Sequence, residues 1–92
     1  MAYFCYIVEC ADGTFYTGWS TDPDRRAKVH NAGHGARYTR QRRPVRLVYI
    51  ESVESHSVAL KRERSLKAMD HQRKKRLADE FLQLSSAESI KE

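Results

Sequence analysis

The sequence predicts an α+β fold, in which a small three-stranded antiparallel sheet packs against helices in the order β-β-α-β-α-α. Aromatic and β-branched residues on both sides of an Asp-Gly pair near the N-terminus are typical of a β-hairpin. From residue 55 onward, apolar residues instead recur at helical spacing. A chain of 92 residues is enough for one domain, which we expect over residues 1–84, followed by a frayed C-terminal tail, 85–92.

The hairpin is expected over residues 2–10 and 15–19, with its turn at Asp12-Gly13. A helix is then predicted from Pro23 to Asn31, because Thr21 can cap its start, proline suits a first helical turn, and Gly33 ends the pattern. The remaining elements follow from the same signals. They are a basic loop over 34–43 closed by Pro44, a third strand over 45–50, a helix over 55–69, and a helix capped by Asp70 that ends near Leu84. In the last helix, Leu77, Phe81 and Leu84 form an apolar stripe that we expect to pack on the sheet.

Basic residues are unevenly distributed along the chain. Between Arg25 and Arg46 there are eight arginines and lysines and no carboxylate, whereas Tyr6 to Trp19 contains no basic residue. The net charge of +5 alone would indicate only solubility. Clustered arginines, which bind phosphate in a bidentate manner, indicate a nucleic-acid partner.

The two cysteines, Cys5 and Cys10, lie in one apolar stretch without a second pair at zinc-finger spacing, so we expect buried thiols. No apolar run approaches the about 20 residues that span a bilayer, and the first ten residues do not resemble a signal peptide. We therefore expect a cytoplasmic protein with no membrane partner and no obligate protein partner.

Glu63 falls at the margin of the apolar stripe of its helix, where a carboxylate is poorly solvated unless it has a partner. A salt bridge to a neighbouring arginine is one interpretation. The other is a ligand for a divalent cation beside bound phosphate, because Mg²⁺ commonly takes one or two protein carboxylates and completes its shell with water and phosphate. The sequence leaves both open.

Phosphodiester cleavage requires a base for the attacking water and stabilisation of the charge on phosphorus. Tyr6 and Tyr16 could supply a base if neighbouring cations favour the phenolate, Arg26 could clamp phosphate, and His30 could move a proton. Strand tyrosines are also common core residues, and a lone helical histidine is often only a partly exposed polar residue.

In this order, these residues resemble the GIY-YIG nuclease family, which is named for two short strand motifs. Here the motifs stand as Cys5-Tyr6-Ile7 and Tyr16-Thr17-Gly18. The likeness extends over roughly residues 3–75 and is greatest to the small stand-alone branch of the family. It continues through the segments 24–31, 33–40, 43–49 and 59–67.

The resemblance implies a GIY-YIG-like fold and a reaction that leaves a 5′-phosphate and a 3′-hydroxyl. It places catalytic roles on Tyr6, Tyr16, Arg26, His30 and Glu63, with Glu63 as the ligand of one Mg²⁺ or Mn²⁺ ion. Which tyrosine is the base stays open, and our choice is Tyr16. The residues expected to contact nucleic acid are Arg25, Arg37, Tyr38, Arg40, Arg42, Arg43 and Lys67.

Cys5 and Thr17 depart from the glycine and isoleucine of the family motifs, but neither position carries a reacting group. The hairpin geometry is a stricter test. A two-residue turn at Asp12-Gly13 would place Tyr6 and Tyr16 on opposite faces of the sheet. A site that uses both tyrosines therefore requires an odd-length turn or a bulge.

The expected function is metal-dependent hydrolysis of DNA, rather than RNA, with low sequence specificity, because phosphate contacts do not read bases. Substrate choice would then come from shape, such as single strands or flaps. Two alternatives remain. One is a nucleic-acid-binding module of the same fold with little or no catalysis, and the other is a partner-binding domain that uses the stripe of the last helix.

Overall fold

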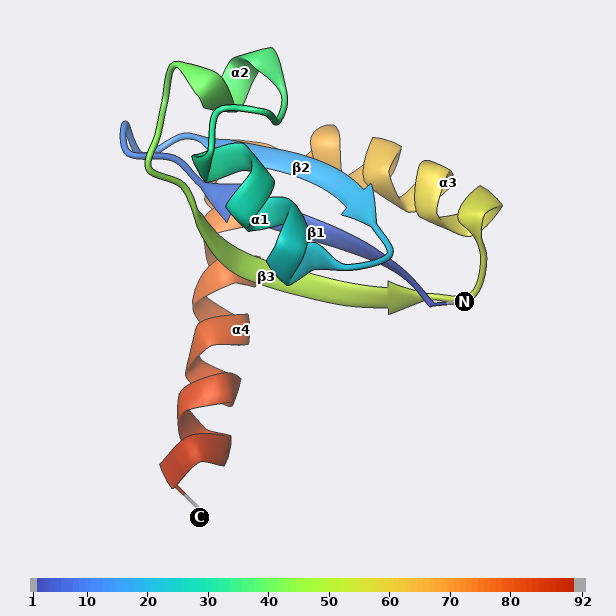
Figure 1. Cartoon of the computed structure of the whole chain (residues 1–92). Coiled ribbons are helices and arrows are strands. Elements are labelled where there is room, and N and C mark those ends of the chain that lie inside the picture. Colours follow the sequence, from blue (N-terminus) through green and yellow to red (C-terminus); the bar gives the residue numbers. More distant parts are fainter. Residues whose placement is uncertain (1, 91–92) are drawn as a thin grey trace.

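The computed structural model describes residues 2–90, and the side chains among them up to residue 84. Strands β1 (Tyr3–Glu9), β2 (Phe15–Ser20) and β3 (Arg46–Val53) form an antiparallel sheet in the order β2-β1-β3 (Figure 1). Helix α1 (Pro23–Asn31) covers one face of this sheet, and helices α3 (His56–Lys67) and α4 (His71–Ile90) pack on the other (Figure 1). The predicted α+β class is confirmed.

Alternation along β1 divides the core between these two faces. Tyr6 and Val8 pack with Val45 on the side of α1. Cys5 and Ile7 point the other way, into clusters completed by residues of α3 and α4. The central strand is therefore buried on both faces, and it holds Tyr6 rigidly. Cys5 and Cys10 are buried free thiols, as predicted.

The hairpin has the register that a shared tyrosine site requires. Val8 lies opposite Tyr16, and Tyr6 lies opposite Gly18, so all four positions are on one face. Tyr6 and Tyr16 share a face because the connection between the two strands, 10–14, has five residues, which is an odd number. The Cys10 amide donates to the Thr14 carbonyl at 2.8 Å, and Gly13, with a φ of 83°, donates to the Cys10 carbonyl at 3.0 Å. The prediction of an odd-length turn is confirmed.

Helix α1 has the predicted bounds, but its N-cap is Asp22 rather than Thr21. The Asp22 carboxylate accepts the Arg25 amide at 3.2 Å, which is the usual capping bond from the third helical position. At the other end, Gly33 has a φ of 85° and donates to the His30 carbonyl, while the His34 amide donates to that of Val29. These two bonds form a Schellman motif, which explains the glycine.

Three elements differ from the prediction by more than two residues. Helix α2 (Arg37–Arg40) is a single turn inside the segment predicted as a loop, and one turn is too short for hydrophobic periodicity to indicate. Strand β3 continues to Val53 rather than ending at residue 50. Helix α4 continues to Ile90 rather than ending near Leu84. Residues 91 and 92 of the expected tail lie outside the described residues, and its fraying stays a prediction.

Helix α3 packs on the sheet through Ala59 and Leu66, whereas Val58 and Leu60, which also contributed to its prediction, are exposed. Ser55 caps α3 by accepting the Val58 amide at 3.2 Å. In α4, Leu77 joins the core and Phe81 meets the Tyr49 ring edge-on at 5.8 Å, whereas Leu84 is 67% exposed. The stripe therefore packs on the sheet as expected, except at Leu84. None of the helices in the described part of the chain is long and apolar enough to cross a bilayer.

Candidate active site at the edge of the sheet

The centre of the candidate site is the Tyr6 hydroxyl, which the sheet carries to its β2 edge. Tyr6 is 1% exposed, and its ring crosses over Gly18 on the neighbouring edge strand. A Cβ atom on Gly18 would lie 2.6 Å from the Tyr6 hydroxyl oxygen. The glycine of the second motif therefore provides the space that the tyrosine of the first motif occupies.

A buried chain of hydrogen bonds starts at this hydroxyl. Tyr6 Oη lies 2.8 Å from His30 Nε2, His30 Nδ1 lies 2.8 Å from Thr39 Oγ1, and Thr39 Oγ1 donates to the Ala36 carbonyl at 2.8 Å. A carbonyl can only accept, so the single hydroxyl proton of Thr39 points to Ala36 and its oxygen accepts from His30 Nδ1–H. In neutral His30, Nε2 is then left to accept the Tyr6 proton.

The protonation states agree with this direction. Burial raises the pKa of Tyr6 to about 12, against the opposing effect of the nearby Arg26 guanidinium. Burial also lowers the pKa of His30, and the charge of Arg26 acts in the same direction. Near neutral pH both groups are therefore uncharged, and the proton rests on Tyr6.

The other predicted catalytic side chains are related to this hydroxyl in two ways, by contact or by charge. Tyr16 packs edge-on to the His30 ring, with centroids 5.3 Å apart. The charges of Arg26 and Glu63 both act on the pKa of Tyr6, in opposite directions, which places both groups within electrostatic reach of its hydroxyl. The structure thus brings Tyr6, Tyr16 and His30 into direct contact, and the charges of Arg26 on α1 and Glu63 on α3 act on this group.

Glu63 has an ionic partner, but the partner is not an arginine as the first interpretation supposed. Its Oε1 lies 3.5 Å from Lys67 Nζ, one helical turn further along α3. The adjacent Arg62 instead donates to both carboxylate oxygens of Glu51, at 2.7 and 3.0 Å. Because neighbouring helical positions point about 100° apart, Arg62 binds the sheet while Glu63 stays at the site.

The donor set around Glu63 fits a hydrated divalent cation. Its side chain is 21% exposed, so water can complete a coordination shell. Among the described side chains, those of residues 2–84, no group of three or more His, Cys, Asp or Glu could hold an ion jointly. A single carboxylate beside a phosphate-binding arginine matches the way Mg²⁺ is held by one or two carboxylates together with substrate phosphate.

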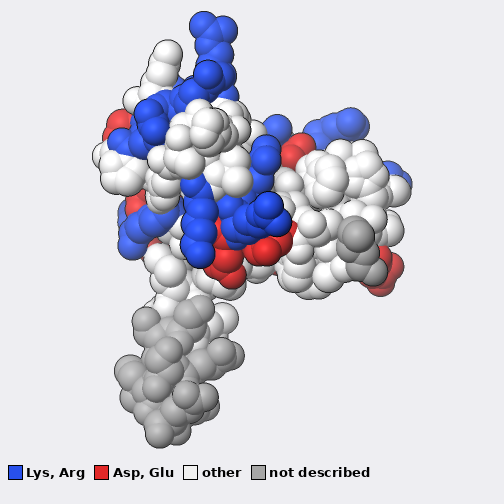
Figure 2. All heavy atoms as spheres, viewed as in Figure 1, with Lys and Arg blue, Asp and Glu red and all other residues white. Residues whose placement is uncertain are grey.

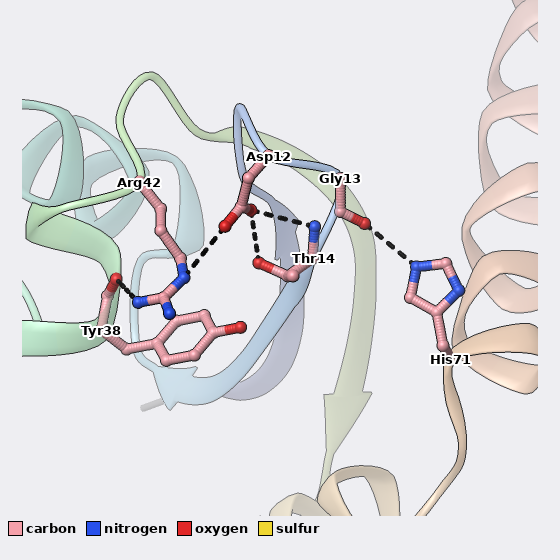
Figure 3. Close-up of polar contacts among 6 residues, drawn as sticks. All are labelled: Asp12, Gly13, Thr14, Tyr38, Arg42 and His71. Carbon is pink, nitrogen blue, oxygen red and sulfur yellow. Dashed lines mark hydrogen bonds and ion pairs between the residues drawn. The ribbon is translucent and has the colours of Figure 1, made fainter.

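Tyr38 and Arg42 form a platform beside Tyr16. The Arg42 guanidinium carbon lies 3.8 Å from the Tyr38 ring centroid, and Arg42 donates to Asp12 at 3.1 Å and to the Tyr38 carbonyl at 3.0 Å (Figure 3). The Tyr38 ring is stacked against that of Tyr16, with centroids 6.1 Å apart. On the opposite side of the hairpin tip, His71 of α4 contacts the Gly13 carbonyl at 3.0 Å (Figure 3). The tip is thus held between the segment that follows α2 and helix α4.

The remaining basic residues differ in their exposure and in their hydrogen bonds. Figure 2 shows lysine and arginine side chains gathered over α1 and α2, with some carboxylates among them. Arg25, Arg37 and Arg40 are exposed on this surface. Arg43 is also exposed, but its guanidinium donates to the carbonyls of Arg40 at 3.0 Å and Asn31 at 3.4 Å. Arg43 therefore braces the end of α1, in addition to any contact with nucleic acid.

Sequence reasoning missed two residues of the site. Thr39 lies in the segment predicted as a loop, and no sequence signal connects it with His30. Asn31 joins the end of α1 to the sheet, since its side chain accepts the Val45 amide at 2.7 Å and donates to the Val45 carbonyl at 2.8 Å. An asparagine at a helix end is an available signal, but its partner could not be read from the sequence.

Comparison with known proteins agrees with this geometry. A family model described as the GIY-YIG catalytic domain matches residues 2–77. A UPF0213 protein of Staphylococcus aureus is 51% identical over 79 residues, covering 86% of this chain and 96% of the relative. A UPF0213 protein of Haloquadratum walsbyi is 49% identical over 78 residues, covering 85% and 88%.

Two solution NMR structures are also similar. A UPF0213 protein from Bacillus halodurans has a TM-score of 0.53 at 43% identity, covering 86% of this chain and 84% of the other. A protein from E. faecalis has a TM-score of 0.57 at 36% identity, covering 88% and 86%. The chain therefore belongs to the GIY-YIG domain family, among small single-domain relatives of the UPF0213 group.

Proposed function

We propose that this protein is a metal-dependent endonuclease that hydrolyses DNA phosphodiesters with low sequence specificity. The observation that carries the proposal is the Glu63 carboxylate, whose charge acts on the pKa of the same Tyr6 hydroxyl as the charge of Arg26. A carboxylate at a phosphate-binding site repels its ligand unless a cation lies between them. In a protein that only bound nucleic acid, this carboxylate would serve only as the salt-bridge partner of Lys67.

The side chains divide the work as follows. Arg26, exposed on α1, binds the scissile phosphate through its forked guanidinium. Tyr16 is the more exposed of the two tyrosines, and it orients the attacking water and accepts its proton. A divalent ion held by Glu63 would supply positive charge to stabilise the phenolate and the transition state.

Tyr6 has a different role in this proposal. It is buried with a pKa raised to about 12, so it does not serve as the base. It holds His30 through the hydrogen bond to Nε2, and His30 in turn packs against the Tyr16 ring. The buried chain therefore fixes the position of the tyrosine that meets water.

The surroundings of the site support a DNA substrate and a cytoplasmic location. The exposed arginines of α1 and α2 can follow a phosphate backbone, and such contacts carry no sequence information. Cleavage should then depend on strand structure more than on sequence. The two buried free thiols fit a reducing compartment.

The test compares Glu63→Gln with Glu54→Gln, which changes an exposed carboxylate between β3 and α3. Labelled single-stranded, flapped and duplex DNA is incubated with Mg²⁺, with Mn²⁺ or with a chelator. We expect cleavage by the unchanged protein only with metal, loss of cleavage in Glu63→Gln with binding retained, and normal cleavage in Glu54→Gln. Arg26→Ala should lose cleavage and also bind DNA more weakly.

Other results would contradict the proposal. Binding without cleavage under every condition would favour the alternative of a binding module, in which Glu63 is a salt-bridge partner of Lys67. Equal residual cleavage in Glu63→Gln and Arg26→Ala would contradict the roles assigned to these two residues.

A further inference from the structure

A hollow of about 410 Å³ opens beside Arg26, where β2 ends and the chain turns into α1. It is lined by Trp19, Ser20, Thr21 and Arg26. Its volume is within the range of roughly 300–1,000 Å³ that is typical of ligand pockets. None of the roles proposed above uses Trp19, Ser20 or Thr21.

The aromatic wall of this hollow is rigidly supported. Trp19 meets the His56 ring of α3 edge-on, with centroids 4.6 Å apart, and lies 6.2 Å from the Tyr3 ring. It also packs against the buried cluster of Cys5, Ala59 and Leu66. The residue is nevertheless only partly buried, and it is one of the four that line the hollow.

The polar wall offers hydroxyl groups and one positive charge. Ser20 Oγ accepts the Asp22 amide at 3.0 Å, which leaves its proton free to donate to a ligand. Thr21 is exposed. The nearby Asp22 carboxylate is occupied at the helix cap, where it accepts the Arg25 amide. The residues that line the hollow carry an indole, two hydroxyls and a guanidinium, which are groups that match the base, sugar and phosphate of a nucleotide.

We propose that this hollow is a nucleotide subsite, which receives the base and sugar next to the phosphate bound by Arg26. The base packs against Trp19, and the hydroxyls of Ser20 and Thr21 contact the sugar-phosphate backbone. Stacking on an aromatic side chain accepts every base, which is consistent with low sequence specificity. This inference rests on the proposed nuclease function and adds a base-binding surface to it.

Trp19 is the only tryptophan of the chain, so its fluorescence reports directly on this hollow. The protein is titrated, with chelator present to prevent cleavage, with a dye-labelled single-stranded thymidine oligonucleotide. A second oligonucleotide of the same length has an abasic residue at every position. Dye anisotropy measures binding, and tryptophan emission measures occupation of the hollow. At saturation we expect the thymidine oligonucleotide to quench Trp19 and the abasic one to leave its emission unchanged.

Two variants separate stacking from charge. Trp19→Ala should weaken binding of the thymidine oligonucleotide by roughly 5- to 150-fold, the usual effect of removing a base-stacking side chain, without changing the affinity for the abasic one. Trp19→Phe keeps an aromatic wall and should retain most of the affinity. The comparison of the two oligonucleotides on the unchanged protein does not depend on the folding of either variant.

The results distinguish failure of this inference from failure of the proposed function. If anisotropy reports binding of both oligonucleotides while Trp19 emission stays constant, the subsite is wrong and nucleic-acid binding stands. An equal loss of affinity for both oligonucleotides in Trp19→Ala has the same meaning. If neither oligonucleotide changes the anisotropy, nucleic-acid binding itself is contradicted, and the subsite with it.

Discussion

At the scale of single residues, the least expected member of the site is Thr39, because it determines which nitrogen of His30 carries the proton. Its hydroxyl proton is committed to the Ala36 carbonyl, so its oxygen can only accept from His30 Nδ1–H. Nε2 is thereby directed to Tyr6. A buried polar chain of this kind is stable only when each donor has an acceptor.

We therefore predict that Thr39→Val destabilises the protein and impairs cleavage, although valine has nearly the same shape as threonine. The change leaves the buried Nδ1–H without an acceptor, which should lower the free energy of unfolding by about 1–3 kcal/mol. Urea denaturation measures the stability, and ¹⁵N NMR of the imidazole reports the tautomer.

The control for this change is Thr39→Ser, which keeps the hydroxyl and should keep the Nδ1–H tautomer and the cleavage rate. If Thr39→Val retained both the tautomer and the rate of Thr39→Ser, the hydroxyl would not orient His30.

At the scale of elements, the site depends on how β2 lies against β1. Gly18 lies opposite Tyr6 on the edge strand, and the Tyr6 hydroxyl fills the space where a side chain would begin. We predict that Gly18→Ala displaces the Tyr6 ring and separates its hydroxyl from His30. The expected result is loss of most cleavage, together with a destabilisation of about 1–3 kcal/mol from overpacking.

Gly13→Ala provides the matched control. Gly13 has a φ of 83°, but a Cβ atom there would meet nothing within 4 Å. This change should therefore cost stability of about 1–2 kcal/mol through backbone strain alone, with cleavage by the folded protein unchanged. Equal cleavage by the two variants under conditions in which both are folded would show that the packing of Tyr6 on Gly18 is not needed.

These elements also show how far the sequence could predict the structure. The hairpin, α1 and its glycine end have local signals, so the positions of Tyr6, Tyr16 and Arg26 could be predicted. The single turn of α2 has no period to detect, and the N-cap differed by one residue because Thr21 and Asp22 are both good caps. The pairs Thr39–His30 and Asn31–Val45 join distant segments, and only the tertiary structure could reveal them.

At the scale of the whole molecule, eight of the 17 lysines and arginines lie between Arg25 and Arg46, and Figure 2 shows basic side chains gathered over α1 and α2. Binding of a polyanion to such a surface releases counterions, so affinity should fall steeply with salt. The arginines do not contribute equally to this effect. Arg37 is exposed on α2, whereas the guanidinium of Arg43 donates to the carbonyls of Arg40 and Asn31.

We predict that Arg37→Ala and Arg43→Ala differ in what they impair. Loss of one phosphate contact lowers the slope of log affinity against log salt by about 0.7 for single strands and 0.9 for duplex DNA. Arg37→Ala should show this reduced slope with unchanged stability, because an exposed arginine contributes little to folding.

Arg43→Ala should instead lower the unfolding temperature, since it removes a brace between α1 and α2, and should change the salt slope less. Anisotropy titrations over a range of salt concentrations, paired with thermal unfolding, measure both quantities. A reduced slope in Arg43→Ala as large as that in Arg37→Ala would mean that Arg43 leaves its carbonyl partners to bind phosphate.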